Sequence, residues 1–313
     1  MKVSKLGRST LCVSTAVAML AGCRGSQPPV GASATIPQQA HARKSPYKLL
    51  YLAEYNSASR LYQTQILSYP AGSQIGLLSE AGSMCADATG DVYIVTSGLI
   101  TEYPPGSTSA IAEASMPSKV SAHACAVDPT TGNIAVTGDQ MVSGGSAGWL
   151  GIYTSLGNSP TLYSDTKMLY LSYCGYDNKG DLFMDAEASG AWFAELPAGS
   201  SNFVNLGEPY AQGTVQWDGQ YITIELPRAD PIIYRLEVSG SSVTTVGQTV
   251  LRSPGRRKDR HLAYTWIGGD TVVAPGRRVV SLGYWHYPAG GQRYHTVPVA
   301  GPIYALLIDN VAQ

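Results

Sequence analysis

One recurring pattern constrains the fold of this chain more than any other: a short strand that is closed by a Pro/Gly-containing turn. Clear copies are Ile66–Gly72, Ile100–Gly106, Phe193–Gly199 and Tyr284–Gly290, and weaker copies are Ile152–Gly157 and Tyr234–Gly240. The glycines that end these six copies follow one another at intervals of 34 to 51 residues. Self-similarity at such a period predicts a repeat architecture built from one supersecondary unit.

A second pattern alternates with the first and consists of an apolar strand, an Asp-to-Gly turn and another strand. It occurs at Cys85–Val95, Cys125–Val136 and Cys174–Met184, and more loosely at Val215–Ile224 and Tyr264–Val273. Asp, Asn and Gly favour a hairpin turn because they tolerate positive φ or cap their own backbone, and the flanking residues are β-branched or aromatic. These segments are therefore predicted to be β-hairpins.

Together the two patterns give each repeat four short strands over about 40 to 50 residues, which is typical of a β-propeller blade. We predict an all-β, six-bladed β-propeller of four-stranded antiparallel blades. Residues 304–310 match the first strand of a repeat but nothing follows them, whereas residues 48–80 supply the other three strands. The C-terminal strand is therefore expected to complete the N-terminal blade and close the ring without an open edge.

The hairpin pattern is clearest at Asp128–Asn133 and Asp177–Asp181. There it resembles that of the secreted six-bladed propellers related to NHL-repeat and SMP-30/gluconolactonase-like proteins. The resemblance extends over nearly all of residues 47–313. It implies an architecture and no particular activity, because propellers include hydrolases, lyases, isomerases and pure binding modules.

The N-terminal segment is predicted to be an export signal. Three basic residues precede the apolar stretch Leu11–Ala21, which is too short to cross a bilayer as a permanent helix. The following Leu20–Cys23 resembles a bacterial lipobox, which implies cleavage before Cys23 and lipidation of its thiol. An ordinary secretory signal with a chance cysteine is the alternative.

We expect residues 1–22 to be a lipoprotein signal peptide, residues 23–46 a lipidated cysteine and flexible tether, and residues 47–313 the propeller domain. The tether is rich in Pro, Ala, Ser and Gln and has no hydrophobic period. The predicted location is the cell envelope, lipid-anchored and extracytoplasmic. In a Gram-negative cell it would be the outer membrane, because Arg24 stands where an inner-membrane retention signal would have Asp.

Composition excludes several classes of protein. With 21 basic and 22 acidic side chains the net charge is -1, so nucleic-acid binding through a general positive field is not expected. The 34 glycines and 19 prolines argue against a helical bundle or coiled coil, and a hydrophobic fraction of 44% argues against disorder.

Three cysteines, Cys85, Cys125 and Cys174, occupy the same repeat position on the innermost strands of successive blades. A thiol cluster or metal site is one interpretation, and simple packing is the other. Equivalent positions on neighbouring blades are expected to exceed the Cα separation of roughly 7 Å that a disulfide tolerates, and three thiols without a nearby His make a poor zinc site. We predict no disulfide, and cysteines that pack as small hydrophobic residues.

In such propellers the loops before the first strand and after the second strand of each blade open on one face, around the central channel. The predicted ligand-binding residues on this face are His123, Tyr173, His261, Arg256, Arg257, Arg277 and Arg278. Paired arginines suit planar anions such as carboxylate or phosphate, although a solvated loop is the alternative. His123 is also a weak candidate for a catalytic acid or base, and a hydrogen-bonded residue of the channel wall is the preferred interpretation.

The leading functional prediction is a monomeric, non-catalytic binding module for a partner protein, a glycan or a small anion, without a cofactor. The alternative is a metal-dependent lactonase or esterase of the SMP-30 kind, or a lyase resembling streptogramin lyase. The weak candidate metal ligands for that alternative are Glu54, Asp185 and Glu225, whose oxygen donors suit Ca²⁺ or Mg²⁺, although no Asn aligns with them. A third possibility is a subunit of an outer-membrane assembly.

Overall fold

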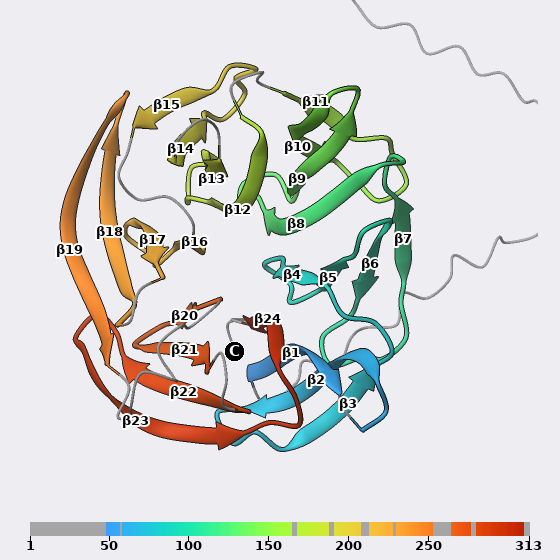
Figure 1. The fold of residues 1–313 in the computed structure, drawn as a ribbon, viewed down its shortest axis with the longest axis vertical. Coiled ribbons are helices and arrows are strands. Elements are labelled where there is room, and N and C mark those ends of the chain that lie inside the picture. Colours follow the sequence, from blue (N-terminus) through green and yellow to red (C-terminus); the bar gives the residue numbers. More distant parts are fainter. Residues whose placement is uncertain are drawn as a thin grey trace, which may run out of the picture. The chain divides into compact units, whose positions relative to one another are not determined.

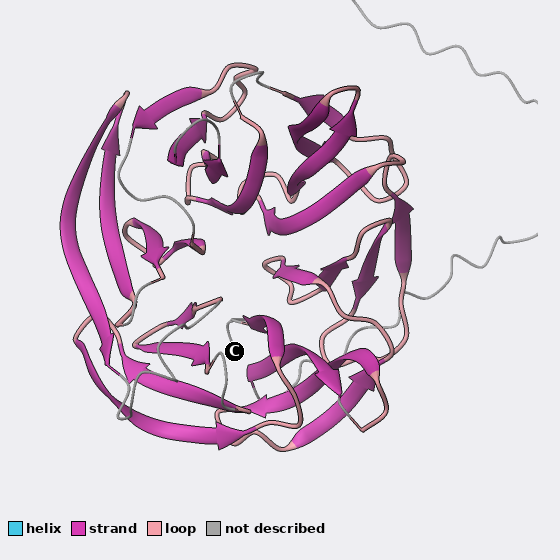
Figure 2. Ribbon diagram, viewed as in Figure 1, coloured by secondary structure: helices cyan, strands magenta, loops and turns pink. Residues whose placement is uncertain are grey.

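The computed structural model describes residues 48–56, 58–164, 168–187, 191–207, 213–227, 230–252, 264–276 and 280–309. The chain divides into Met1–His41 and Ala42–Gln313, and all of the described residues belong to the second unit. Within these ranges the chain consists of strands, turns and loops, as Figure 2 shows. No helix in the described part of the chain is long and apolar enough to cross a membrane.

The described strands form four four-stranded sheets and one eight-stranded sheet, which stand around a common centre (Figure 1). The first sheet has the order β24–β1–β2–β3, with β24 (Ile303–Ile308), β1 (Lys48–Asn56), β2 (Leu61–Tyr69) and β3 (Gln74–Leu78). The second contains β4 (Ser83–Ala86), β5 (Val92–Val95), β6 (Leu99–Tyr103) and β7 (Ala112–Ser115). The third contains β8 (Val120–Val127), β9 (Ile134–Val142), β10 (Gly145–Tyr153) and β11 (Thr161–Tyr163). The fourth contains β12 (Tyr170–Tyr176), β13 (Leu182–Glu187), β14 (Ala191–Leu196) and β15 (Val204–Gly207).

The eight-stranded sheet consists of two antiparallel four-stranded halves. One half contains β16 (Val215–Trp217), β17 (Ile222–Leu226), β18 (Ile232–Ser239) and β19 (Ser242–Arg252). The other contains β20 (Trp266–Gly268), β21 (Thr271–Pro275), β22 (Ser281–His286) and β23 (Gly290–Pro298). The halves are joined into one sheet through their last strands, where β19 pairs in parallel with β23 at Leu251↔Gly291 and Arg252↔Gln292. The chain is therefore all-β in its described part, with antiparallel four-stranded units as the sequence predicts.

The last described strand pairs with the first. β24 runs antiparallel to β1, with register from Leu50↔Ile308 to Ala53↔Ala305. The sheet thus combines one strand from the end of the chain with three from its beginning, and Figure 1 shows the two colours of the chain ends side by side.

Aspartates hold the hairpin turns in place. The Oδ1 atom of Asp128 accepts from the backbone N and the Oγ1 of Thr130 at 2.8 and 2.7 Å. The carboxylates of Asp87, Asp177 and Asp218 likewise accept from the backbone N–H two residues further on. Gly90, with φ of 89°, takes the left-handed conformation that the turn requires. These aspartates are turn caps, and the hairpins predicted from the sequence are confirmed.

The hydrophobic core lies between neighbouring sheets and not at the centre of the molecule. Among the described residues, buried apolar side chains form six clusters. One contains Val95, Trp149 and Tyr153 from the second and third sheets, and another contains Leu52 and Val273 from β1 and β21. Each sheet therefore buries both faces against its neighbours, which leaves the innermost strands free to border a central channel.

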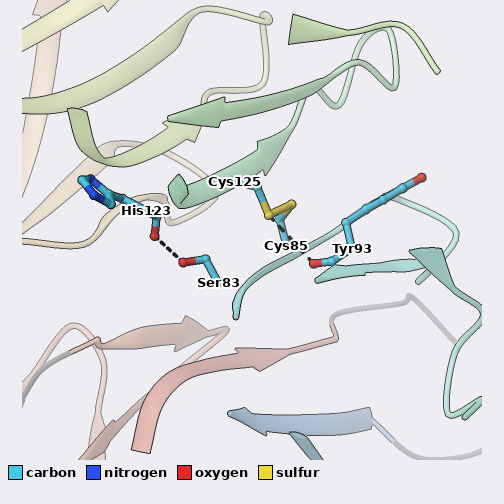
Figure 3. Close-up of a disulfide and its surroundings, with 5 residues drawn as sticks. All are labelled: Ser83, Cys85, Tyr93, His123 and Cys125. Atoms are coloured by element: carbon cyan, nitrogen blue, oxygen red, sulfur yellow. Dashed lines mark hydrogen bonds between the residues drawn. A yellow bond between two sulfur atoms is a disulfide. The ribbon is translucent and has the colours of Figure 1, made fainter. Parts of the chain in front are cut away.

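Cys85 and Cys125 form a disulfide, so the prediction that no disulfide would form is wrong (Figure 3). Their Cα atoms lie 5.6 Å apart, inside the range that a disulfide needs. The reason is that β4 and β8 converge near the centre, where the Ser83 hydroxyl donates to the backbone oxygen of His123. Cys174 is a free thiol, and burial raises its pKa to about 12.

Candidate functional site

The innermost strands of the sheets border the central channel, and they define its two faces. These strands are β24, β4, β8, β12, β16 and β20. We use "top face" for the side on which these strands begin, where sequence analysis places the ligand, and "bottom face" for the side on which they end in the Asp-containing turns.

His123 lies on the top face and links three strands. Its Nε2 atom is 3.0 Å from Oδ1 of Asp139 on β9, and its Nδ1 atom is 3.1 Å from the backbone oxygen of Leu171 on β12. The imidazole is about 30% exposed. Both ring nitrogens face oxygen atoms of the protein, so neither is directed towards a ligand in the channel. This geometry fits a residue of the channel wall that ties neighbouring sheets together.

Tyr173 is close to His123 at the same mouth of the channel. Its ring lies 5.8 Å from that of Tyr264, edge to face, and both rings border a small cavity of about 60 Å³ that His123 also lines. Burial raises the pKa of the Tyr173 hydroxyl, and the nearby Tyr264, Glu225 and Asp185 raise it further. The tyrosine therefore stays neutral and can donate a hydrogen bond.

Glu54 and Glu225 are buried behind the top face, and each accepts hydrogen bonds from neighbouring side chains. Oε1 of Glu54 accepts from Gln63 at 2.8 Å and also from Gln65, both on the paired strand β2. Oε2 of Glu225 accepts from the hydroxyls of Thr214 and Thr265, each at 2.9 Å. Burial raises the pKa of Glu225, and these hydrogen bonds oppose the shift.

The three carboxylates that were candidate metal ligands are not brought together. Asp185 is buried on β13, opposite Tyr173 in the sheet, while Glu54 and Glu225 lie on β1 and β17. In the described ranges no group of three or more His, Cys, Asp or Glu side chains could hold a metal ion. The described residues thus contain no arrangement of the kind expected for a lactonase-like metal centre.

The predicted anion site belongs to segments that the structure does not describe. Arg256, Arg257, His261, Arg277 and Arg278 lie outside the described residues, as does Cys23. Their proposed roles remain predictions.

The channel also has a cavity at the bottom face, where the sequence did not suggest a site. A cavity of about 570 Å³ there is lined by residues of all six innermost strands, including Tyr176, Trp217 and Trp266, and by the disulfide. Cys125, Cys174, Val215 and Trp266 also line the small top cavity, so they separate the two mouths. The available signal was the aromatic residue directly before the turn aspartate, as in Tyr176-Asp177 and Trp217-Asp218.

A cluster of aromatic side chains marks the top face at the first sheet. The rings of Tyr55 and Tyr62 are 5.1 Å apart, and those of Tyr62 and Tyr304 are 5.6 Å apart. Tyr62 and Tyr304 are 57% and 43% exposed, and the adjacent Leu61 is 61% exposed. We call Leu61, Tyr55, Tyr62 and Tyr304 the aromatic patch. It comes from β1, β2 and β24, and so from both ends of the chain.

No family model and no curated protein sequence matches this chain. Solved structures match in fold. A chain of a crystallised nidogen/laminin complex aligns with a TM-score of 0.60 at 11% identity, covering 85% of this chain and 99% of that one. A protein of unknown function from Bacteroides caccae aligns with a TM-score of 0.56 at 10% identity, covering 84% of this chain and 99% of that one. At such low identity the likeness concerns the fold alone, and with the sheet arrangement it supports a β-propeller.

Proposed function

We propose that this protein is an envelope-anchored β-propeller that binds a partner protein through its top face. The observation that carries the proposal is the aromatic patch. Monomeric proteins expose few contiguous apolar surfaces, and exposed clusters of aromatic side chains mark interaction sites. Tyrosine is enriched in protein interfaces because it contributes a large apolar area together with a polar hydroxyl.

The scaffold makes such a patch suitable for recognition. The three tyrosines sit at strand ends that are fixed by main-chain pairing, β1 with β2 and β1 with β24. A surface held by a rigid sheet loses little conformational entropy when it binds a partner. The nidogen/laminin neighbour is a propeller-like chain that was crystallised with another protein, which fits this use of the fold and does not extend its partner to this chain.

We further propose six blades, closed by β24. The support is the two antiparallel halves of the eight-stranded sheet, which with the four smaller sheets make six four-stranded units, and the six clusters of buried apolar residues. The parallel contact between β19 and β23 involves two residue pairs, and we interpret it as a local contact between adjacent blades.

The proposed location rests on the lipobox-like Leu20–Cys23. The disulfide between Cys85 and Cys125 supports it, because disulfides persist in oxidising compartments outside the cytosol. Lipidation of Cys23 together with the polar segment 24–46 would place the propeller outside the membrane surface, on a flexible tether.

A metal-dependent lactonase or esterase, the alternative activity, has less support. One carboxylate oxygen of Glu54 and one of Glu225 accept hydrogen bonds from neighbouring side chains, and among the described residues these two form no metal-binding group with Asp185. A small anion is a further candidate ligand, because the sequence contains segments rich in arginine. Replacing Arg256 and Arg257 by Ala would abolish saturable binding of inorganic phosphate or citrate if that prediction is right.

The protein-partner proposal is tested by site-specific photocrosslinking in intact cells of the source organism. A photoreactive amino acid replaces Tyr62 in one variant and Leu162 in a matched control. Leu162, on the outer strand β11 of another sheet, is 57% exposed, as Tyr62 is. We expect a discrete protein adduct from position 62 and none of that mass from position 162.

The captured partner is then purified and titrated against the full chain. Tyr62→Ala is expected to weaken binding by about 30-fold or more, the effect of removing an interface hot spot, while Leu162→Ala leaves it unchanged. Equal adducts from both positions, or a Tyr62→Ala variant that binds like the wild type, would refute the proposal. Binding only to a purified glycan would assign the same patch to carbohydrate instead.

A further inference from the structure

A polar pocket of about 460 Å³ lies on the bottom face between two neighbouring units, β12–β15 and β16–β19. Figure 1 shows these two units side by side along the ring. One wall comes from the turn Asp177–Asp181 and from β14, and Trp217 and Tyr221 line the other. The pocket is separate from the aromatic patch, so an inference about it is independent of the proposed partner protein.

The pocket is strongly acidic. Its charged lining residues are Asp177, Asp181, Glu195, Glu237 and Lys179, four carboxylates against one ammonium group. Lys179 is exposed and is not within ion-pair distance of any of these carboxylates. The site therefore has more negative than positive side chains, which favours a cation from outside.

Glu195 on β14 is the most telling of these residues. It is only 9% exposed, and its carboxylate has no hydrogen-bond or ion-pair partner among the described residues. Burial raises its pKa, repulsion from Asp181 and Asp177 raises it further, and Lys179 opposes the shift. Without a donor from the protein, this carboxylate can form hydrogen bonds only on the side that faces the pocket.

The second sheet contains the same arrangement and serves as an internal reference. In its turn, the backbone N of Asp91 donates to Oδ1 of Asp87 at 3.0 Å. In the pocket, the backbone N of Asp181 donates to Oδ1 of Asp177 at the same distance. The two turns therefore share the pattern Asp-x-x-Gly-Asp and this backbone-to-carboxylate hydrogen bond.

The strands that follow these turns are equivalent as well. Tyr93 pairs with Glu102 across β5 and β6, and Phe183 pairs with Glu195 across β13 and β14. The hydroxyl of Tyr93 donates to Oε1 of Glu102 at 3.4 Å. Phe183 has no hydroxyl. In the pocket the glutamate has thus lost the internal donor that its counterpart keeps, and it borders open space instead.

We propose that this pocket binds an organic cation, a primary ammonium or guanidinium group, which pairs with Glu195. N–H donors of such a group supply the hydrogen bonds that Phe183 cannot, and charge-assisted pairs of this kind are among the stronger ones. The aromatic rings of Trp217 and Tyr221 add surfaces that attract cations. A divalent metal ion fits less well, because in the described ranges these carboxylates do not form a metal-binding group.

Isothermal titration calorimetry of the full chain in detergent tests the proposal at low ionic strength. The probes are n-butylammonium and n-butylguanidinium, with n-butanol as the neutral control and CaCl₂ as the inorganic cation. We expect both organic cations to bind, and Glu195→Gln to weaken them about 10-fold or more. Glu102→Gln removes the matched carboxylate of the second sheet and leaves their affinity unchanged.

Phe183→Tyr provides a second variant in case Glu195→Gln does not fold. The new hydroxyl corresponds to that of Tyr93 in the second sheet, so it donates a hydrogen bond to Glu195 and weakens cation binding. Equal affinity in wild type and both variants, binding of n-butanol as tight as that of n-butylammonium, or saturable binding of Ca²⁺ alone would overturn the proposal.

The same cation could come from a free polyamine or from a side chain of a basic protein. Spermidine and the peptides acetyl-Gly-Lys-Gly-amide and acetyl-Gly-Arg-Gly-amide separate these sources. Binding of the peptides that Glu195→Gln abolishes supports a Lys or Arg side chain. Glu195-dependent binding of spermidine without the peptides supports a free amine, and the absence of Glu195-dependent binding by any of them refutes the site.

Discussion

The disulfide between Cys85 and Cys125 gives a prediction whose size can be worked out from the structure. It joins β4 to β8, the innermost strands of neighbouring sheets, and closes a loop with a sequence separation of 40 residues. In the chain-entropy description, a cross-link over a loop of that length removes about 13 cal/mol/K from the unfolded chain, or about 4 kcal/mol at 25 °C. Replacing both cysteines by Ala should lower the free energy of unfolding by up to that amount.

Urea titration followed by tryptophan fluorescence measures the loss. With an m-value of about 3 kcal/mol/M, a loss of about 4 kcal/mol moves the midpoint down by about 1.3 M. Dithiothreitol should lower the midpoint of the wild type by a similar amount and leave that of Cys85→Ala/Cys125→Ala unchanged.

Cys174→Ala is the matched control, because Cys174 occupies the same repeat position and is buried but carries no disulfide. It should cost about 1 kcal/mol through lost packing and keep the full response to dithiothreitol. A double variant with an unchanged midpoint, or one that still responds to dithiothreitol, would show that the two sulfurs are not bonded to each other.

Two further predictions follow from the described and the N-terminal residues. Burial raises the pKa of Glu225 above its ordinary value of 4.5, so the folded state binds this proton more tightly than the unfolded state does. The free energy of unfolding therefore falls as the pH rises from 4.5 through the raised pKa. Glu225→Gln should flatten this fall in urea titrations between about pH 4 and pH 8. The control Glu113→Gln, at an exposed position, should leave the pH dependence as it is in the wild type. An unchanged pH dependence of the free energy of unfolding in Glu225→Gln would contradict the assignment. Cys23→Ser should abolish lipidation and release the protein from the membrane fraction, which intact-mass spectrometry and fractionation measure, and a membrane-bound serine variant would refute the lipoprotein assignment.

Much of the fold could be predicted because its signals are local. The Asp and Gly residues of the hairpin turns are fixed by the backbone conformation of a few neighbouring residues, as the hydrogen bonds of Asp87 and Asp128 show. The same local pattern repeats along the chain, so the assignment of one hairpin also applies to the hairpins of the other repeats. The pairing of the last strand with the first also left a sequence signal, because each end of the chain supplies an incomplete repeat.

The disulfide could not be predicted in this way, because it depends on how closely the innermost strands approach one another. That approach is set by contacts between sheets, such as the bond from Ser83 to the backbone of His123, and no local pattern encodes it. The same limit applies to Glu195. Its sequence context resembles that of Glu102, and only the strand register shows that Phe183 replaces the tyrosine that would serve it.

The roles of the candidate site residues stay predictions, and the structure shows only where some of them lie. His123 and Tyr173 do lie together at the top mouth of the channel, as the order of the strands implied. Glu54, Asp185 and Glu225 occupy the same position in three different repeats. They lie on different sheets around the ring, so the three are not brought together. The cavity on the bottom face was not predicted, because ligands were expected at the top face alone.

The central claim is a ring of sheets that the last strand closes, since the top face, the channel and both proposed sites depend on it. Its most direct test is the cross-link expected in Ala53→Cys/Ala305→Cys, whose positions are opposite each other in β1 and β24. Directly opposed residues of an antiparallel pair are close enough for a disulfide. We predict that mild oxidation of the folded full chain yields a peptide pair joined through positions 53 and 305, found by mass spectrometry, and that the control Ala53→Cys/Ala135→Cys yields none. Absence of the 53–305 cross-link, or an equal yield from the control pair, would contradict the closed ring.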